Sequence, residues 1–297
     1  MINIVSLFLC LILSTSFIFA QSETDSSPSN GEKNNSLFWE INRDDLSQPS
    51  YLYGTIHLIP KDSFFLLPAV EDALASSQEL VLEIPLDMNF GTILSSAMWM
   101  LIPGGKSLKD YLSEEDYSTV RTFMKDSLSS PIPMYHKIKP LLTAQQITTM
   151  YCGGTEMESY ELVFSQKFKE WKKTVSGLET MKDQMDALDE ISIEEQAEGL
   201  LETTRSPRAA CEQLAEMVRV YRQQDLTALM EMTQESEDLD EHLETLLDKR
   251  NEKWIPKIEK LLVKHQVFIA VGAGHLAGPK GVIQLLRNAG YSVRPVQ

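Results

Sequence analysis

The chain has 297 residues and a formal net charge of −16 at pH 7, with 43 acidic against 27 basic side chains. This length allows one large domain or two modest ones, with enough apolar residues to form a core. The negative charge, without any run of Lys or Arg, argues against nucleic acid or an anionic membrane surface as a partner.

Residues 1–20 are typical of a signal peptide that is cleaved after Ala20. The segment carries no charged side chain and is apolar from Ile4 to Cys10 and again up to Phe19. It lacks the Lys or Arg usual near the start of such peptides, so a retained membrane anchor is the alternative. A signal peptide predicts an exported protein, periplasmic or secreted, with no further membrane span.

Residues 21–36 are polar and predict a flexible leader, because they contain too few apolar side chains to form a core. The folded domain is expected over residues 37–297. After removal of the signal peptide only Cys152 and Cys211 remain, and export favours a disulfide between them. Two buried free thiols are the alternative.

One short pattern occurs near both ends of the domain: a strand followed by Gly-x-x-His. The first copy is Gly54 to His57 and the second is Gly272 to His275, with Gly274 inside it. Each is followed by a loop, an amphipathic helix and another strand. Two β-α-β units place the loops after their strands at one edge of a sheet, so we expect the two histidines to meet there.

The strand after the first helix contains a glutamate among apolar residues. Glu83 follows Leu80–Leu82, and a buried carboxylate is costly unless it is paired or binds a cation. An outward-pointing Glu83 at the strand end is the alternative. The apolar stretch 90–102 is too short to cross a bilayer and predicts a core helix or a hydrophobic flap over the site.

Residues of about 104–264 show mainly helical periodicity and predict a helical insertion between the two β-α-β units. Helix starts are indicated by Ser113 with Asp116, Thr155 with Glu158, and Ser192 with Glu195. A brief strand-like run delivers Glu179 at an element boundary, and Arg250 with Asn251 lies on the last long helix. The predicted class is therefore α/β (α+β), with a central mixed sheet and a helical insertion.

Two imidazoles and a carboxylate can hold a divalent metal with an open position for water, and a second glutamate can then act as general base. A His/Glu pair without metal is the alternative for acid-base hydrolysis. The sequence contains no Gly-x-Ser-x-Gly, no His-Glu-x-x-His and no phosphate-binding loop. A third reading makes both histidines structural.

An ordered set of motifs resembles the TraB/GumN family, which includes the TIKI proteases. The set consists of the two Gly-x-x-His motifs, the Glu83 strand, Gly177 to Thr180, Arg250-Asn251 and the glycines around His275. The resemblance extends from about Leu37 to Val296. It implies the fold type of erythromycin esterases (EreA) and ChaN-like proteins. It also implies a site that depends on a divalent metal, manganese or cobalt rather than zinc.

By this resemblance His57, His275 and Glu83 are the expected metal ligands. Glu179, Arg250 and Asn251 are expected around them, with Glu83 or Glu179 as the base and Arg250 on a substrate carboxylate or an oxyanion. The backbone at the site is expected to include Gly54, Gly272 and Gly274. The sequence thus predicts an exported metal-dependent hydrolase, with a peptidase as the favoured class and a peptide or protein as substrate. The alternative is a secreted protein that binds a peptide or polysaccharide without chemistry.

Overall fold

The computed structural model describes residues 35–85, 97–128, 132–152, 156–234 and 242–296. The predicted signal peptide, most of the leader and most of the apolar stretch before Ile102 lie outside these residues. Within them, six strands form one mixed sheet in the order β6-β4-β7-β2-β1-β8. The strands are β1 (Phe38–Asn42), β2 (Ser50–Thr55), β4 (Glu79–Leu82), β6 (Thr174–Gly177), β7 (Val267–Gly272) and β8 (Ser292–Pro295).

The sheet is parallel in the part that carries the site. β7 pairs in parallel with both β2 and β4, and β4 pairs in parallel with β6. β1 pairs antiparallel with β2 and with β8. The carboxyl ends of β2, β4, β6 and β7 therefore lie at one edge, which is where open α/β sheets place their sites. The predicted α/β class with a central mixed sheet is confirmed.

The sheet contains two β-α-β units, and the first strands of these units, β2 and β7, are neighbours in the sheet. The first is β2, α2 (Pro68–Ser76) and β4; the second is β7, α13 (Val282–Asn288) and β8. Proline at the first turn of α2 suits the helix start, where its missing N–H costs nothing. Since β7 lies between β2 and β4, the two Gly-x-x-His turns follow adjacent strands.

Helices predominate between β4 and β7, and β6 interrupts them. They are α4 (Glu114–Asp126), α5 (Pro140–Cys152), α6 (Tyr160–Glu170), α7 (Met181–Leu188), α8 (Ile193–Arg205), α9 (Pro207–Arg222), α10 (Leu226–Gln234) and α12 (Lys249–Leu262). The expected caps at Ser113 and Ser192 are present. Thr155 lies outside the described residues, and the helix start expected there is wrong because Met157–Glu158 form a short strand, β5, paired with β3 (Ile59–Pro60). Ser159 caps α6 instead.

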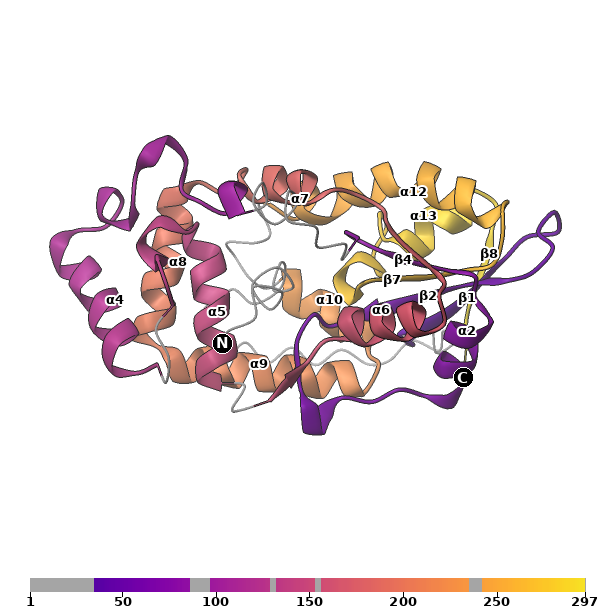
Figure 1. Cartoon of the computed structure of the whole chain (residues 1–297), viewed down its shortest axis with the longest axis horizontal. Helices are drawn as coiled ribbons and strands as arrows, with labels where there is room; N and C mark the ends of the chain where they lie inside the picture. Colours follow the sequence, from indigo (N-terminus) through magenta and orange to yellow (C-terminus); the bar gives the residue numbers. More distant parts are fainter. Residues whose placement is uncertain (1–34, 86–96, 129–131, 153–155, 235–241, 297) are drawn as a thin grey trace, which may run out of the picture.

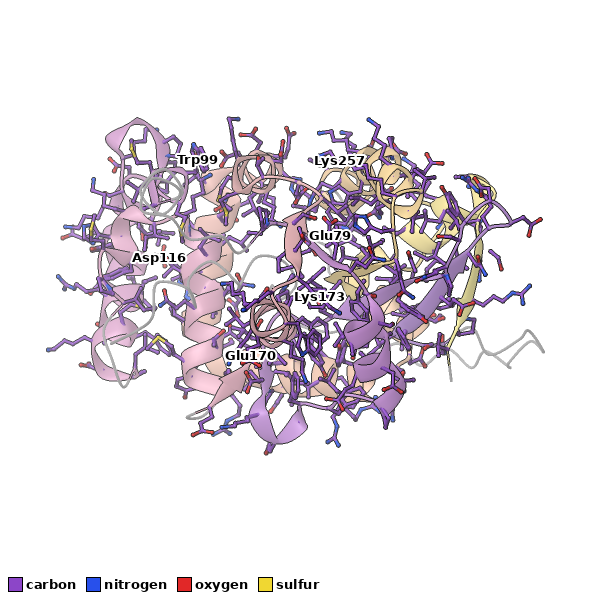
Figure 2. All side chains as sticks on the ribbon, turned by 45° about the vertical axis from the view of Figure 1, so that its right-hand side comes forward. Glu79, Trp99, Asp116, Glu170, Lys173 and Lys257 are labelled. Carbon is purple, nitrogen blue, oxygen red and sulfur yellow. A yellow bond between two sulfur atoms is a disulfide. The ribbon has the colours of Figure 1, made fainter. Side chains whose placement is uncertain are left out.

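Figure 1 shows α12 and α13 on one side of the sheet and α2 and α6 on the other, while α4, α5 and α8 form a separate helical end. Trp99 and Asp116 lie in this helical end, Glu79 lies in the sheet at the start of β4, and Lys257 lies on α12 (Figure 2). A disulfide between Cys152 and Cys211 joins α5 to α9. No helix of the described residues is long and apolar enough to cross a membrane.

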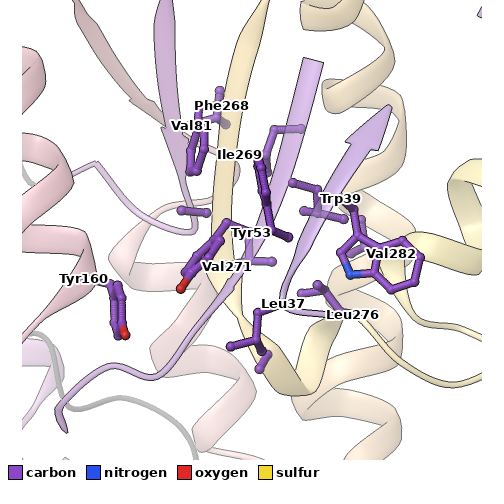
Figure 3. Packing of buried hydrophobic residues seen from close by; sticks show 14 of the residues in the cluster. Leu37, Trp39, Tyr53, Val81, Tyr160, Phe268, Ile269, Val271, Leu276 and Val282 are labelled. Atoms are coloured by element: carbon purple, nitrogen blue, oxygen red, sulfur yellow. The ribbon is translucent and has the colours of Figure 1, made fainter. Parts of the chain in front are cut away.

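The core of the molecule lies on both faces of the sheet. Tyr53 and Tyr160 pack on one side of the strands, and Trp39 packs with Val282 on the other (Figure 3). β7 is buried along its whole length. Burial of each large apolar side chain contributes roughly 1.5–3 kcal/mol to folding, so the central strand is the most firmly held part of the site's scaffold. Before β1, Asn35 and Ser36, which the leader prediction includes, are held by hydrogen bonds to Asp225 and Phe38.

Candidate active site

The sheet edge brings the predicted site residues together. His57 follows β2, Glu83 follows β4, Glu179 follows β6, and His275 ends a single 3-10 turn, Ala273–His275, after β7. The β4–β6 pairing continues past the strands, since the Glu179 N–H donates to the Glu83 carbonyl at 2.8 Å. These four side chains therefore follow four parallel strands at the same edge of the sheet, as expected for parallel strands.

Glu83 is the centre of the site and is 5% exposed. Its Oε1 accepts the Gly272 N–H at 2.8 Å, and its Oε2 accepts from Arg250 Nη2 at 2.7 Å and from Gln184 Nε2 at 3.0 Å. Burial works against the ionised carboxyl, but His275, Arg250 and His57 and the Gly272 N–H lower the pKa of Glu83 to about 2. The ionised carboxylate is therefore the favoured form of Glu83.

His57 is half-buried, and its Nδ1 lies 3.0 Å from Oε1 of Glu161. Burial lowers the pKa of the imidazole, but the charge and hydrogen bond of Glu161, and then Glu83, outweigh burial, so the net shift is upward. The other ring nitrogen faces Gly272: a methyl group built on this glycine would lie 3.5 Å from His57 Nε2 and 3.3 Å from Glu83 Oε1. Glycine leaves this space open.

His275 is 1% exposed and is held by Asn251. The Asn251 amide donates to the carbonyls of His275 and Lys280, so its Oδ1 accepts the Nδ1 hydrogen of His275 at 2.7 Å. The lone pair of Nε2 then accepts from Arg250 Nη1 at 3.2 Å and lies 3.8 Å from Glu83 Oε1. Burial, with the positive charges of Arg250 and His57, lowers the pKa of His275 to about 3, so the ring is neutral.

Arg250 uses all its donors on the protein. Its guanidinium hydrogen bonds reach Glu179, Glu83, His275 and the Leu246 carbonyl, which belongs to the π-helix η5 (Glu244–Asp248) preceding α12. No N–H of Arg250 remains free in this arrangement, and the expected contact with a substrate carboxylate or an oxyanion stays a prediction. Its observed contacts are with the two carboxylates and the imidazole.

Glu179 lies behind Arg250 and away from the histidines. Its oxygens accept from Arg250 Nε and Nη2 and from Trp254 Nε1 at 3.0 Å. Glu83, by contrast, approaches both imidazoles. The question the sequence left open is thus answered by position: Glu83 is the carboxylate between the histidines.

Two possible ligands of a divalent cation, an imidazole and a carboxylate, border the face of Gly272 that lacks a side chain. Nε2 of His57 and Oε1 of Glu83 border that space, and the Cδ2 atom of His275 would lie 3.7 Å from a methyl group there. Two buried carboxylates, Glu83 and Glu179, pair with the Arg250 guanidinium, and a third, Glu161, lies beside His57. Among the described residues, no group of three or more His, Cys, Asp or Glu side chains is arranged to hold a metal ion. His57 and Glu83 would hold the ion, and His275 would join them on releasing Arg250.

The glycines predicted at the site have distinct surroundings. A methyl group on Gly54 would lie 3.2 Å from the Ala273 Cα, so β2 and the turn after β7 approach closely there. The Gly54 carbonyl accepts from the Tyr221 hydroxyl at 2.9 Å. Gly274 is buried in the turn that carries His275.

Sequence reasoning missed three groups at the site: Glu161, Gln184 and Trp254. Trp254 lies four residues after Arg250 and so on the same helix face, and the centroid of its ring lies 4.5 Å from that of the His275 ring. Glu161 was missed because the start of α6 was placed too early. Gln184 has no sequence signal, because its contact with Glu83 joins segments 101 residues apart.

A family model described as the TraB/PrgY/gumN family matches residues 37–295. The chain is 24% identical to "Metalloprotease TIKI1" of Danio rerio, over 87% of this chain and 63% of the relative. It is 22% identical to "Metalloprotease TIKI1" of Homo sapiens, over 87% of this chain and 61% of the relative. It is 23% identical to "Metalloprotease TIKI homolog" of Amphimedon queenslandica, over 98% of this chain and 68% of the relative.

The chain thus covers less than two thirds of the length of these two vertebrate relatives. No solved structure matches the chain. The expected likeness to the erythromycin esterase (EreA) and ChaN-like fold therefore stays a prediction.

Proposed function

The chain belongs to the TraB/PrgY/gumN family, and on this premise we propose that it is a metal-dependent hydrolase of the peptidase class, acting on a peptide or protein. The observation that carries the proposal is the convergence of His57 Nε2 and Glu83 Oε1 on the open face of Gly272. The relatives' names, which describe metalloproteases, agree with this chemistry.

His57 and Glu83 hold the ion in this proposal, with His275 as a third ligand. Manganese or cobalt is favoured over zinc, because carboxylate oxygen is a hard ligand and only two imidazoles are present. A bound divalent ion would polarise a substrate carbonyl and lower the pKa of a bound water. Glu83 would supply negative charge to the cation.

The remaining groups keep these ligands in place. Asn251 holds the His275 ring through Nδ1, and Arg250 fixes Glu83 against Glu179. Removal of such an outer partner typically costs 10- to 100-fold, roughly, in metal affinity or activity. We further propose export of the protein through residues 1–20, which the disulfide between Cys152 and Cys211 supports, since disulfides persist in oxidising compartments.

The test is a cleavage assay on a complex mixture of peptides, read by mass spectrometry, with manganese(II) or cobalt(II) added and with chelator as reference. Wild type should generate new termini, and His57→Ala should generate none. His136→Ala, which removes an imidazole of the short turn Tyr135–Lys137 that is not among the predicted site residues, should cleave like wild type. Peptides retained by the protein but left intact would favour the binding protein instead, and equal cleavage by wild type and His57→Ala would refute the proposed site.

A further inference from the structure

Glu161 is a buried carboxylate on the second residue of α6, and it contacts His57, a proposed metal ligand. It is 7% exposed. Its Oε1 receives the Thr55 hydroxyl at 2.6 Å and lies 3.0 Å from His57 Nδ1, and its Oε2 receives the Ser159 hydroxyl at 2.9 Å. Thr55 belongs to the first Gly-x-x-His motif, so this motif supplies both the histidine and a hydrogen bond to its partner.

The direction of these hydrogen bonds follows from the surroundings. The Ser159 oxygen accepts the Leu162 N–H at 3.3 Å, which leaves the hydroxyl hydrogen to point at Glu161. An ionised carboxylate also suits the first turn of a helix, where unpaired N–H groups make the end positive. Glu161 therefore acts as an acceptor on both oxygens, and the hydrogen between it and His57 belongs to Nδ1.

We infer that Glu161 is a positioning residue that holds His57 in one tautomer, with hydrogen on Nδ1 and the lone pair on Nε2. A neutral imidazole has one donor and one acceptor nitrogen, and the hydrogen bond at one decides the role of the other. Nε2 is the atom that faces Glu83 and Gly272. Glu161 thus keeps the ligand lone pair on the side of the ring where the carboxylate lies.

The second histidine has the same arrangement with a different partner. Asn251 Oδ1 accepts from His275 Nδ1, as Glu161 accepts from His57. The two imidazoles are thereby fixed with their Nε2 atoms toward Glu83, by side chains from α12 and from α6. A charged acceptor on His57 and a neutral one on His275 make His57 the more basic of the two nitrogen ligands.

This inference rests on the proposed function only in making His57 Nε2 a metal ligand; the tautomer is a property of the metal-free protein. The first measurement is therefore long-range ¹H–¹⁵N NMR of the His57 ring in metal-free protein, at a pH where the ring is neutral. The second is calorimetric titration with manganese(II). Both are carried out on Glu161→Met, which keeps the side-chain volume but removes the acceptor.

We expect wild-type His57 to be the single Nδ1–H tautomer, Glu161→Met to show a mixture, and its manganese affinity to fall by about 10- to 100-fold. Glu161→Gln restores an acceptor oxygen and should restore the tautomer. Ser159→Ala removes the helix cap and one donor to Glu161 but leaves the His57 contact, so it controls for stability. If Glu161→Met does not fold, Glu161→Ala takes its place.

An unchanged single tautomer together with an unchanged affinity in the Met or Ala variant would overturn the role of Glu161. A wild type that binds no manganese but shows the Glu161-dependent tautomer would refute the metal site and keep the positioning role. If Ser159→Ala changed the His57 tautomer as much as Glu161→Met does, the tautomer would depend on the folding of α6 rather than on the Glu161 carboxylate. This result would overturn the assignment to Glu161.

Discussion

Arg250 Nη1 donates to His275 Nε2 at 3.2 Å, so the nitrogen expected to bind a metal already accepts a hydrogen bond from a cation. The same guanidinium pairs with Glu83 and Glu179. Arg250 thus supplies a positive charge to the site beside the space over Gly272. A divalent ion that recruits His275 must replace this hydrogen bond.

Arg250→Met should lower the free energy of unfolding by about 3–5 kcal/mol in metal-free protein, because it leaves Glu83 and Glu179 buried without their charge partner. Urea denaturation followed by circular dichroism measures the change. Arg205→Met is the matched control, since Arg205 pairs with Asp116 on the surface and such pairs are worth about 0–1 kcal/mol. Equal effects of the two substitutions would contradict a buried ion-pair network.

Acid should destabilise the protein through two site residues. The folded-state pKa of Glu83 is about 2, below the ordinary 4.5, so its stabilisation is present above pH 4.5 and is lost as the pH falls toward 2. The pKa of His275 is about 3, below the ordinary 6.5, so the unfolded chain binds the extra proton and stability falls from pH 6.5 downward.

His57 acts in the opposite direction, because its pKa is raised: its contribution is present below pH 6.5 and is lost as the pH rises through the folded-state value. The comparison is therefore made in the His57→Gln background. There, unfolding free energies at pH 7, 6 and 5 should fall more steeply with His275 than with His275→Gln. Parallel pH profiles would show that His275 titrates normally.

Gly272→Ala should weaken manganese binding by at least about tenfold, the order seen when the ligands of a site are displaced. The added methyl group would lie 3.3 Å from Glu83 Oε1 and 3.5 Å from His57 Nε2, in the space proposed for the ion. Calorimetric titration measures the affinity, and thermal unfolding in chelator shows whether the fold is retained. Full affinity in a folded Ala variant would place the ion elsewhere.

Replacement of Cys152 and Cys211 by Ala should lower the unfolding free energy by about 4 kcal/mol in the chain-entropy model, since the bond closes a loop with a sequence separation of 59. The bond joins α5 to α9, away from the sheet edge, so manganese affinity should stay within about threefold, the effect of 0.6 kcal/mol. Reduction of wild type should reproduce the variant. A large loss of affinity would show that the helical end shapes the site.

The class of the fold was predictable because its signals are local. β7 is a run of apolar residues buried at every position, and each Gly-x-x-His repeat follows directly on its strand. The order of the strands was not, because the insertion of β7 between β2 and β4 depends on contacts between distant segments. The start of α6 was misplaced because Thr155 with Glu158 and the true cap Ser159 offer similar local signals.

The place of a site residue was predictable where the residue directly follows a strand that the sequence itself indicates. His57, Glu83 and His275 meet because parallel strands end at one edge. The partners were not predictable, because Glu161 and Gln184 come from helices whose docking is set by tertiary packing. The same limit applies to Arg250, which pairs with two carboxylates that no local pattern places beside it.

The central claim is that two histidines share one divalent ion, and its most direct test is the metal content after equilibrium dialysis against manganese(II), measured by elemental analysis. Wild type should hold close to one ion per chain, and the His57→Ala, His275→Ala double variant should hold none. The His136→Ala, His242→Ala double variant, which loses the same number of imidazoles elsewhere, should match wild type. No ion in a folded wild type, or an equal content in the two double variants, would contradict the claim.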